Sequence, residues 1–264
     1  MRALDTAATG MAAMDLKVQV IAGNIANMST TGFKSQRAEF QDLIYEHVQR
    51  IGAQASDQGT ILPVGIDIGG GVKTVGTPRT MTQGTLSQTG NDLDLAITGE
   101  GFFKIQMPDG TFQYTRDGTF QQDNTGRIVN AQGNPVQPTI TIPQNASGLA
   151  VNAQGQVSVQ LPGAATTTST IIGQIGLTRF INKAGLLPVG SNLYTDTPSS
   201  GTPQDGLASA EGFGSLTQGS LEQSNVDVVS EMSNLIAAQR AYEMNAKVIT
   251  AADQMMQSAT ALFR

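Results

Sequence analysis

Residues 4–28 read LDTAATGMAAMDLKVQVIAGNIANM, and this stretch sets the helical character of the N-terminal end. Its apolar side chains recur at alternating steps of three and four residues, at Leu4, Ala7, Met11, Met14, Val18, Ile21, Ile25 and Met28. That spacing places them on one face of an α-helix, in the heptad seam typical of paired helices. The pattern ends at the turn formers Ser-Thr-Thr-Gly of residues 29–32, so we predict a helix that stops there.

The C-terminal end has a similar pattern. Its seam consists of Val228, Met232, Leu235, Tyr242, Ala246, Ile249, Met256 and Phe263, with Gln239, Asp253 and Thr260 as polar members. Ser224, Asn225 and Asp227 are candidate N-caps, because their short polar side chains can accept hydrogen bonds from the first helical N–H groups. We predict a helix from about Asp227 to Leu262, roughly 54 Å long at 1.5 Å per residue.

The two terminal helices are natural partners for each other, and two arrangements fit their seams. One is an intramolecular helical hairpin that closes a single domain, and the other is a seam for assembly with further subunits. Ala7 and Ala246 bury little area, so an isolated pair of these helices would be only marginally stable. The residues alone leave both arrangements open.

The middle of the chain changes to a period of two, which predicts strands. These segments are residues 93–97, 102–107, 111–116, 127–130, 139–142, 156–161 and 171–180. Turn signals such as Pro108-Asp109-Gly110 and Asp117-Gly118 separate many of them, as in antiparallel hairpins. The spacing leaves no room for βαβ units, so we predict an α+β chain and no doubly wound nucleotide-binding sheet.

The remaining stretch, about Glu46 to Arg79, has only patchy alternation and contains Gly69-Gly70-Gly71, so we interpret it as an extended arm. The predicted organisation has three parts: a discontinuous helical domain of residues 1–33 and 224–264, an arm of residues 34–80, and a β-rich domain of residues 81–223.

Composition excludes several classes of protein. The 264 residues include no Cys and a single His, His47, which removes disulfides, thiolate metal sites, Cys nucleophiles and His-pair metal sites. With 15 basic and 21 acidic residues the net charge is −6, which argues against a nucleic-acid partner. The N-terminus lacks the pattern of a cleaved signal peptide, and no apolar run reaches the roughly 20 residues of a membrane span.

Motifs for chemistry mostly fail. Residues 65–74 superficially match a phosphate-binding loop, but Val72 stands where the glycine before lysine is required. Gly99-Glu100-Gly101 lacks the third glycine of a dinucleotide site. Asp92, Asp94 and Glu100 could form a carboxylate cluster, or could simply form a turn entering a strand. We therefore expect no catalytic residue, cofactor or metal site.

The residues beside the seams are diagnostic. Residues 24–34, NIANMSTTGFK, resemble the signature of the bacterial flagellar rod and hook proteins. Residues 224–229, 234–236 and 239–247 resemble the matching C-terminal motif, and residues 36–45, 99–103 and 114–118 extend the resemblance over essentially the whole chain. The resemblance marks as family residues Asn24, Asn27, Thr31, Gly32, Phe33, Lys34, Asn225, Gln239, Arg240, Ala241, Glu243, Asn245 and Lys247.

The resemblance implies a structural subunit of the distal rod. Such a subunit polymerises into a rigid hollow helical tube that crosses the periplasm, transmits motor torque to the hook and encloses the export channel. The helices would pair as a coiled-coil inner domain, the β domain would form the outer layer, and residues 46–64 resemble the insertion that separates the straight rod from the bendable hook.

The implied partners are further copies of the chain, proximal rod and hook proteins or a hook adaptor, the surrounding bushing rings, and the flagellar type III export apparatus. Nucleic acid and membrane insertion are not implied, and export would proceed without signal cleavage. The alternatives are another axial subunit of the same family, from the hook or the proximal rod, or a secreted β-rich hydrolase or adhesin.

Overall fold

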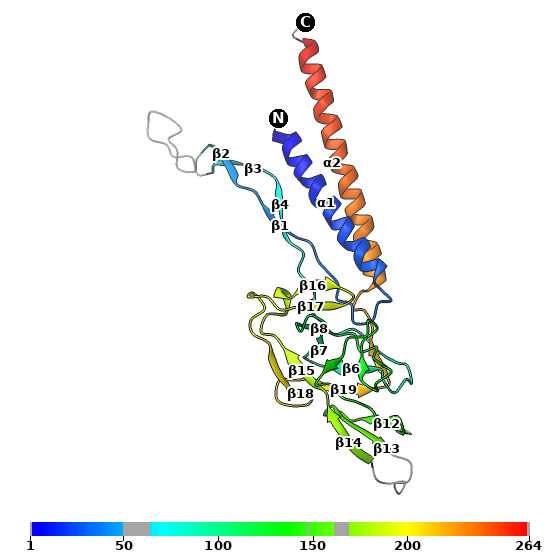
Figure 1. Cartoon of the computed structure of the whole chain (residues 1–264). Coiled ribbons are helices and arrows are strands. Elements are labelled where there is room, and N and C mark those ends of the chain that lie inside the picture. The colour runs from blue at the N-terminus through cyan, green and yellow to red at the C-terminus, as the bar shows by residue number, and fades with distance from the viewer. Residues whose placement is uncertain (1, 50–63, 147, 161–168, 263–264) are drawn as a thin grey trace. The chain divides into compact units, whose positions relative to one another are not determined.

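The structure is a computed structural model that describes residues 2–49, 64–146, 148–160 and 169–262. It confirms the α+β class, with one helix at each end of the chain and strands between them (Figure 1). The chain divides into two compact units. The helix-and-arm unit comprises Met1–Ile25, Gln36–Pro78 and Asp227–Arg264, and the β unit comprises Ala26–Ser35 and Arg79–Val226.

Helices α1 (Arg2–Ala26) and α2 (Val228–Leu262) begin and end close to the predicted positions. Asp227 caps α2, since its carboxylate accepts hydrogen bonds from the Val229 N–H at 3.2 Å and the Ser230 hydroxyl at 2.6 Å. The bond from Ser230, together with that from Val229, holds the pKa of Asp227 below its usual value. Within the described residues, neither helix is long and apolar enough to cross a membrane.

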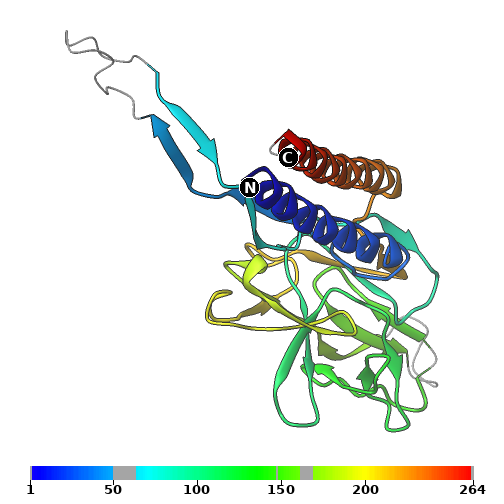
Figure 2. The same ribbon diagram turned by 90° about the horizontal axis from the view of Figure 1, so that it is seen from above.

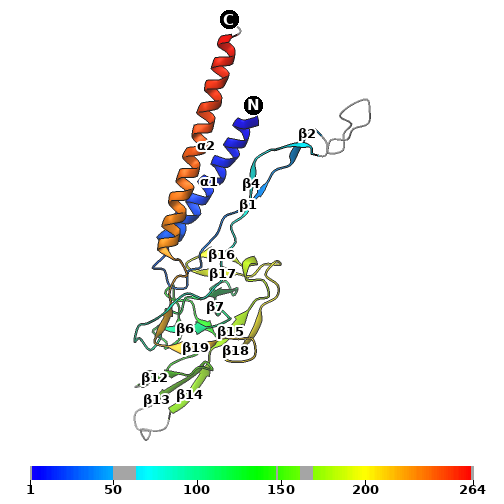
Figure 3. The same ribbon diagram turned by 180° about the vertical axis from the view of Figure 1, so that it is seen from behind.

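The two helices lie side by side in every view (Figures 1, 2 and 3). Asn24 Nδ2 donates to Glu231 Oε1 at 3.0 Å near one end of the pair. Further along, Gly10 faces Asn245, and a Cβ added at Gly10 would lie 2.9 Å from Asn245 Nδ2. The second contact lies earlier in α1 and later in α2 than the first, so the helices are antiparallel.

The arm consists of paired strands in the residues that the structure describes. Strand β1 (Glu39–Asp42) pairs with β4 (Val72–Gly76), and β2 (Tyr45–Gln49) pairs with β3 (Ile66–Gly69), both antiparallel. The sequence interpretation assigned no strands here, because exposure of side chains on both faces leaves no alternating pattern. Most of the predicted rod-specific stretch, residues 50–63, lies outside the described residues.

The β unit contains short strands and a 3₁₀ turn. Its elements are β5 (Leu86–Gln88), β6 (Leu95–Thr98), β7 (Phe103–Gln106), β8 (Phe112–Thr115), β9 (Gln121–Gln122), β10 (Ile128–Val129), β11 (Val136–Gln137), β12 (Gly148–Val151), β13 (Gln156–Gln160), β14 (Ser169–Gln174), β15 (Gly176–Arg179), η1 (Lys183–Gly185), β16 (Leu187–Gly190), β17 (Leu193–Thr195), β18 (Gln204–Leu207), β19 (Ser215–Gln218) and β20 (Ser220–Glu222).

These strands form one five-stranded sheet in the order β11-β7-β8-β17-β16, a three-stranded sheet β12-β13-β14, and the pairs β15-β18, β19-β6, β20-β5 and β10-β9 (Figure 3). Every pairing is antiparallel among the described strands, which confirms the prediction from turn spacing.

Two predicted strands were wrong in detail. Residues 139–142 form only an isolated bridge from Thr141 to Arg127, although Ile140 and Ile142 are buried as their alternation suggested. Residues 171–180 are two strands rather than one. The chain changes partners at the buried Ile175, because β14 pairs with β13 whereas β15 pairs with β18.

The β unit carries the large hydrophobic core. Its main cluster contains Leu95, Ile97, Phe103, Ile105, Phe120, Ile128, Val136, Ile140, Ile142, Val157, Val159, Ile175, Leu177, Leu193, Ala208 and Leu216. An aromatic cluster adds Phe102, Tyr114, Phe180, Leu186 and Tyr194, in which the Tyr114 and Phe180 rings meet edge to face at 4.8 Å. Full burial of a large apolar side chain contributes about 1.5–3 kcal/mol, so this unit holds its stability within one chain.

Candidate assembly surface

Helix α2 exposes a run of large apolar side chains that we call the α2 apolar surface. They are 40–74% exposed: Val229, Met232, Ile236, Tyr242, Met244, Val248, Met255 and Met256. Large exposed apolar side chains concentrated along one helix, rather than scattered singly over a surface, are typical of an interaction site. α2 therefore offers a contact surface that its own chain leaves open among the described residues.

The predicted seams divide between the helix pair and this open surface. In α1 and the following turn, Ile21 is buried, Leu4, Met11, Met14, Val18 and Ile25 are partly buried, and Met28 is exposed. In α2, Val228, Leu235, Ala246 and Ile249 are partly buried, whereas Met232, Tyr242 and Met256 are exposed. Phe263 lies outside the described residues.

A second stripe of α2 faces α1, and only Asn245 among its members was named from the sequence. Glu231, Ala238, Asn245 and Ala252 are spaced seven apart, with Ala238 and Ala252 buried and the other two in contact with α1. Each of these four residues lies one position before a member of the predicted seam, so the seam of larger apolar side chains did not include them. The signal that could have found them is the heptad spacing of small residues, which permits close approach of two helices.

Asn24 and Asn225, one from each signature, hydrogen-bond to backbone groups that lie outside the named strands. Asn24 is 2% exposed and exchanges hydrogen bonds with Gln36, donating to its carbonyl at 2.8 Å and accepting from its N–H at 2.9 Å. Asn225 accepts from the Ser35 N–H at 2.8 Å and donates to the Thr80 carbonyl at 2.8 Å. An amide side chain supplies both donor and acceptor, which no hydrophobic residue could replace.

Lys34 belongs to a buried ionic group with Glu222 and Arg116. Its Nζ lies 2.5 Å from Glu222 Oε1, and the two side chains are 1% and 0% exposed. Arg116 Nη1 lies 3.3 Å from Glu222 Oε2, and Arg116 Nη2 donates to the Gly99 carbonyl at 2.6 Å. Burial lowers the pKa of both Lys34 and Arg116, and the contacts with Glu222 oppose that effect. This group joins three segments far apart in sequence.

The residues between Asn24 and Lys34 include a tight turn at Gly32. Gly32 has φ +67°, and a Cβ there would lie 2.7 Å from the Asp117 backbone nitrogen, so glycine is required. The Thr31 carbonyl accepts from Asn192 Nδ2 at 3.0 Å, and Asn27 Oδ1 accepts from the Thr30 hydroxyl at 3.2 Å. The N-terminal signature therefore fixes the chain path after α1.

The C-terminal signature behaves differently on α2. Its charged and long polar members are exposed, namely Gln239, Arg240, Glu243 and Lys247, while Ala241 and Asn245 are partly buried. Asn245 contacts α1 at Gly10. The exposed members lie on the same helix as the α2 apolar surface and are accessible to other molecules.

The three carboxylates considered for a catalytic or metal cluster have separate surroundings. Asp94 is buried and accepts from the Thr89 hydroxyl at 2.6 Å and Asn91 Nδ2 at 3.0 Å. Glu100 pairs with Lys183 at 2.5 Å, and Asp92 is exposed. No cluster of three or more metal-ligating side chains occurs among the residues that the structure describes.

The glycine-rich segment of the arm is also structural. It runs through β3 and β4 with no helix after it, unlike a phosphate-binding loop. A Cβ at Gly71 would lie 2.4 Å from Thr9 Oγ1, so this turn approaches α1 closely. His47 Nδ1 lies 2.5 Å from Asp67 Oδ1, across the β2–β3 pairing.

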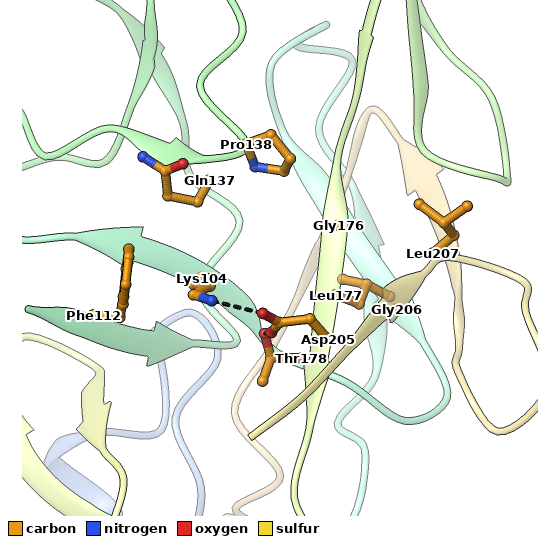
Figure 4. A pocket seen from close by; sticks show the side chains of 10 residues that line it. All are labelled: Lys104, Phe112, Gln137, Pro138, Gly176, Leu177, Thr178, Asp205, Gly206 and Leu207. Atoms are coloured by element: carbon orange, nitrogen blue, oxygen red, sulfur yellow. Dashed lines mark hydrogen bonds and ion pairs between the residues drawn. The ribbon is translucent and has the colours of Figure 1, made fainter. Parts of the chain in front are cut away.

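A hollow of about 390 Å³ in the β unit holds a charged pair (Figure 4). Lys104 Nζ lies 2.7 Å from Asp205 Oδ2 and 4.4 Å from the centroid of the Phe112 ring, and the Thr178 hydroxyl donates to Asp205 at 2.5 Å. Burial would raise the pKa of Asp205, but the bonds from Lys104 and Thr178 outweigh it and hold the pKa below its usual value. The charged groups satisfy each other, which favours a structural role.

Comparison with known proteins matches three parts of the chain. Residues 4–34 match the model described as flagella basal body rod protein, and residues 217–262 match flagellar basal body rod FlgEFG protein C-terminal. Residues 96–159 match the D1 domain of flagellar hook protein FlgE/F/G. The flagellar basal-body rod protein FlgG of Caulobacter vibrioides is 50% identical over 262 residues, 99% of each chain. The chain belongs to the flagellar basal-body rod protein family.

Other relatives extend this match. FlgG of Agrobacterium fabrum is 46% identical over 255 residues, 97% of each chain. The rod protein FlgF of Caulobacter vibrioides is 34% identical over 244 residues, covering 92% of this chain and 90% of that one. As a flagellar basal-body rod protein the chain is a structural subunit and not an enzyme, and it assembles into the basal body with other flagellar proteins.

Proposed function

We propose that this rod protein is a subunit of the distal rod, which polymerises into a rigid hollow helical tube. The tube transmits motor torque across the periplasm to the hook and encloses the export channel. The higher identity to FlgG than to FlgF in Caulobacter vibrioides supports this assignment over a proximal rod subunit. The alternative is another axial position in the same family, in the hook or proximal rod.

The α2 apolar surface is the observation that carries the proposal. Eight large apolar side chains stand 40–74% exposed along one 35-residue helix. Burying such side chains against a neighbouring subunit contributes on the order of 1 kcal/mol or more for each. Repeated along a helical array, those contacts would stabilise both the helix and the polymer.

The close contact of α1 with α2 supports an inner coiled-coil layer. The buried residues of the two helices include four alanines, Ala7, Ala13, Ala238 and Ala252. Gly10 of α1 lies directly against Asn245 of α2. Narrow helix pairs can pack densely around a channel, and the β unit would then form the outer layer.

The proposed partners follow from the resemblance to the distal rod subunit. They are further copies of the chain, proximal rod and hook proteins or the hook adaptor at the rod ends, the surrounding bushing rings, and the flagellar type III export apparatus. Export would proceed without signal cleavage. We also propose that residues 46–64 stiffen the rod.

A substitution experiment tests the proposal. Replacing Met232, Ile236 and Met255 together by Ser should abolish rod assembly and motility, because it removes apolar contact area without touching the β-unit core. A matched control replaces Ile171 and Ile181, exposed apolar residues of the β unit, by Ser. Loss of motility in the control alone, or normal rods from the α2 variant, would contradict the proposal.

A further inference from the structure

The β unit contains a second, smaller hollow that we call the Arg79 pocket. Its volume is about 190 Å³, and its lining includes Asn27, Phe33, Arg79, Ser191, Asn192 and Tyr194. Pockets for small molecules and cofactors occupy about 300–1,000 Å³. The Arg79 pocket is therefore of the size that holds one side chain rather than a metabolite.

Two aromatic rings hold the Arg79 side chain. The guanidinium carbon lies 5.8 Å from the centroid of the Phe33 ring and 5.6 Å from that of the Tyr194 ring. These distances are within the range of cation–π attraction. The rings restrict the guanidinium plane but do not neutralise its positive charge.

The hydrogen bonds of Arg79 are incomplete. Nη1 donates to the Lys34 carbonyl at a long 3.4 Å, and the Tyr194 side chain bonds to Arg79 as well. Nε is buried and has no hydrogen-bond partner among the described residues, and no carboxylate there lies within 4.0 Å of the guanidinium. A buried donor without an acceptor is destabilising, and the Arg79 side chain, which lines the hollow, has no carboxylate partner to offset that cost.

Two other arginines show what Arg79 lacks. Arg116 also has an unpartnered Nε, but Glu222 neutralises its charge. Arg179 also stacks on a ring, with Phe213 at 5.5 Å, but its Nη2 donates to Gln204 Oε1 at 2.9 Å. Within the described parts of the chain, Arg79 combines an aromatic clamp, a free buried donor and an uncompensated charge beside a hollow.

We propose that the Arg79 pocket binds a carboxylate, supplied by an Asp or Glu side chain of a second copy of this chain. A guanidinium presents two parallel N–H donors that match the two oxygens of a carboxylate, and such pairs are strong and oriented. The chain carries 21 acidic against 15 basic residues, so a second copy offers acidic side chains in excess. The choice of a second copy as the source of the carboxylate rests on the polymer proposed above.

The first experiment tests the pocket on the wild-type monomer. The Arg79 Nε–H signal is followed by NMR while acetate is added, with chloride at equal ionic strength as the control. We expect a saturable shift of the Arg79 signal, with a dissociation constant on the order of 10 mM, and no such shift for Arg179. A response equal to that in chloride would overturn the carboxylate site, whatever the polymer does.

The second experiment identifies the source of the carboxylate. Rod assembly is compared for wild type, Arg79→Lys and Arg79→Gln, with Arg179→Gln as the matched stacked-arginine control. We expect both Arg79 variants to assemble poorly, since Lys keeps the charge but loses the two-donor geometry, and the control to assemble normally. Variants that keep the wild-type unfolding midpoint give the valid comparison.

The outcomes separate this inference from the proposed function. Normal rods from Arg79→Lys and Arg79→Gln, together with saturable acetate binding, would show that the pocket binds a carboxylate from solution. That result would overturn the claim that a second copy of the chain supplies the carboxylate. Failure of the wild-type chain to form rods would instead overturn the proposed function, while the acetate result would stand on its own.

Discussion

The helix-and-arm unit and the β unit bury different kinds of side chain. The β unit encloses Phe103, Ile97 and more than a dozen other apolar residues in one cluster. In the two helices the buried apolar residues among those described are Ile21 and four alanines. The larger side chains of α2 face outward. The β unit therefore has a closed core of its own, whereas the helices leave large apolar side chains open, as the proposed polymer requires.

The family signatures also differ between the two regions. Asn24 and Asn225 make hydrogen bonds within the chain, and Lys34 forms an ion pair within it. Arg240 and Lys247 on α2 are exposed. The first set therefore fixes the chain path, and the second set is available for contacts between subunits.

Rod assembly should respond most strongly to loss of the end of α2. Ending the chain before Met255 removes the last turns of α2 and part of the α2 apolar surface. We predict that rods and motility are lost completely while the shortened subunit stays soluble, because the β-unit core is untouched. Motility assays and electron microscopy of basal bodies check this. A motile truncation strain would show that the end of α2 is dispensable.

The next effect concerns the buried ionic group. Glu222→Gln leaves the charges of Lys34 and Arg116 buried without a carboxylate. Breaking a buried ion pair by removing one partner costs about 3–5 kcal/mol, and we predict a loss of that order in the free energy of unfolding of the β unit. Urea unfolding measures it.

A matched control for that change is Glu39→Gln. Glu39 pairs with Arg37 on the surface, where the side chains are 42% and 75% exposed. Exposed pairs contribute about 0–1 kcal/mol, so this variant should unfold nearly as wild type does. Equal losses in the free energy of unfolding for Glu222→Gln and Glu39→Gln would contradict the prediction that the buried ionic group contributes more to stability than the surface pair.

A paired truncation of core residues compares the units directly. Phe103→Ala in the β unit should cost about 3–5 kcal/mol in the free energy of unfolding, because it opens a cavity in a closed core. Ile21→Ala in α1 should change the unfolding of the monomer by less than about 1 kcal/mol but weaken rod assembly, because the helix pair adds little to monomer stability. A large loss for Ile21→Ala in the monomer would mean that the helix pair is stable alone.

The smallest effect appears at alkaline pH. Burial, with smaller contributions from Asp196 and Asp205, raises the pKa of Tyr114 from 10.0 to about 12. The stability that this shift contributes is complete below pH 10 and is lost as the pH rises toward 12. We predict that Tyr114→Phe flattens the decline of the unfolding midpoint between these values. Tyr242→Phe, on the exposed surface of α2, is the control.

The sequence predicts the helices and the class of the chain better than the full set of strands, because β5, β12 and β16–β20 have no predicted counterpart. Both helices, the α+β class and the antiparallel pairing follow from local periodicity and turn residues such as Asp109-Gly110. Arm strand β2 was missed because its side chains are exposed on both faces, which erases the alternating pattern. Ala238 and Ala252 were missed because each lies one position before the predicted seam, which followed the larger apolar side chains.

The sites that depend on long-range contacts could not be predicted. Lys34 and Glu222 are 188 residues apart, and nothing local in either segment indicates that they form an ion pair. The Arg79 pocket likewise brings Phe33 and Tyr194 to one guanidinium from distant segments. Such sites are properties of the folded chain, whereas the signature around Gly32 is visible in the sequence because a positive φ demands glycine.

Amide hydrogen exchange of the monomer and of the assembled rod tests the central difference between the two units most directly. We predict that core strands such as β7 (Phe103–Gln106) and β13 (Gln156–Gln160) are protected in both states. α1 and α2 should exchange rapidly in the monomer and become protected only in the rod. Equal protection of the helices and the β core in the monomer would contradict the account.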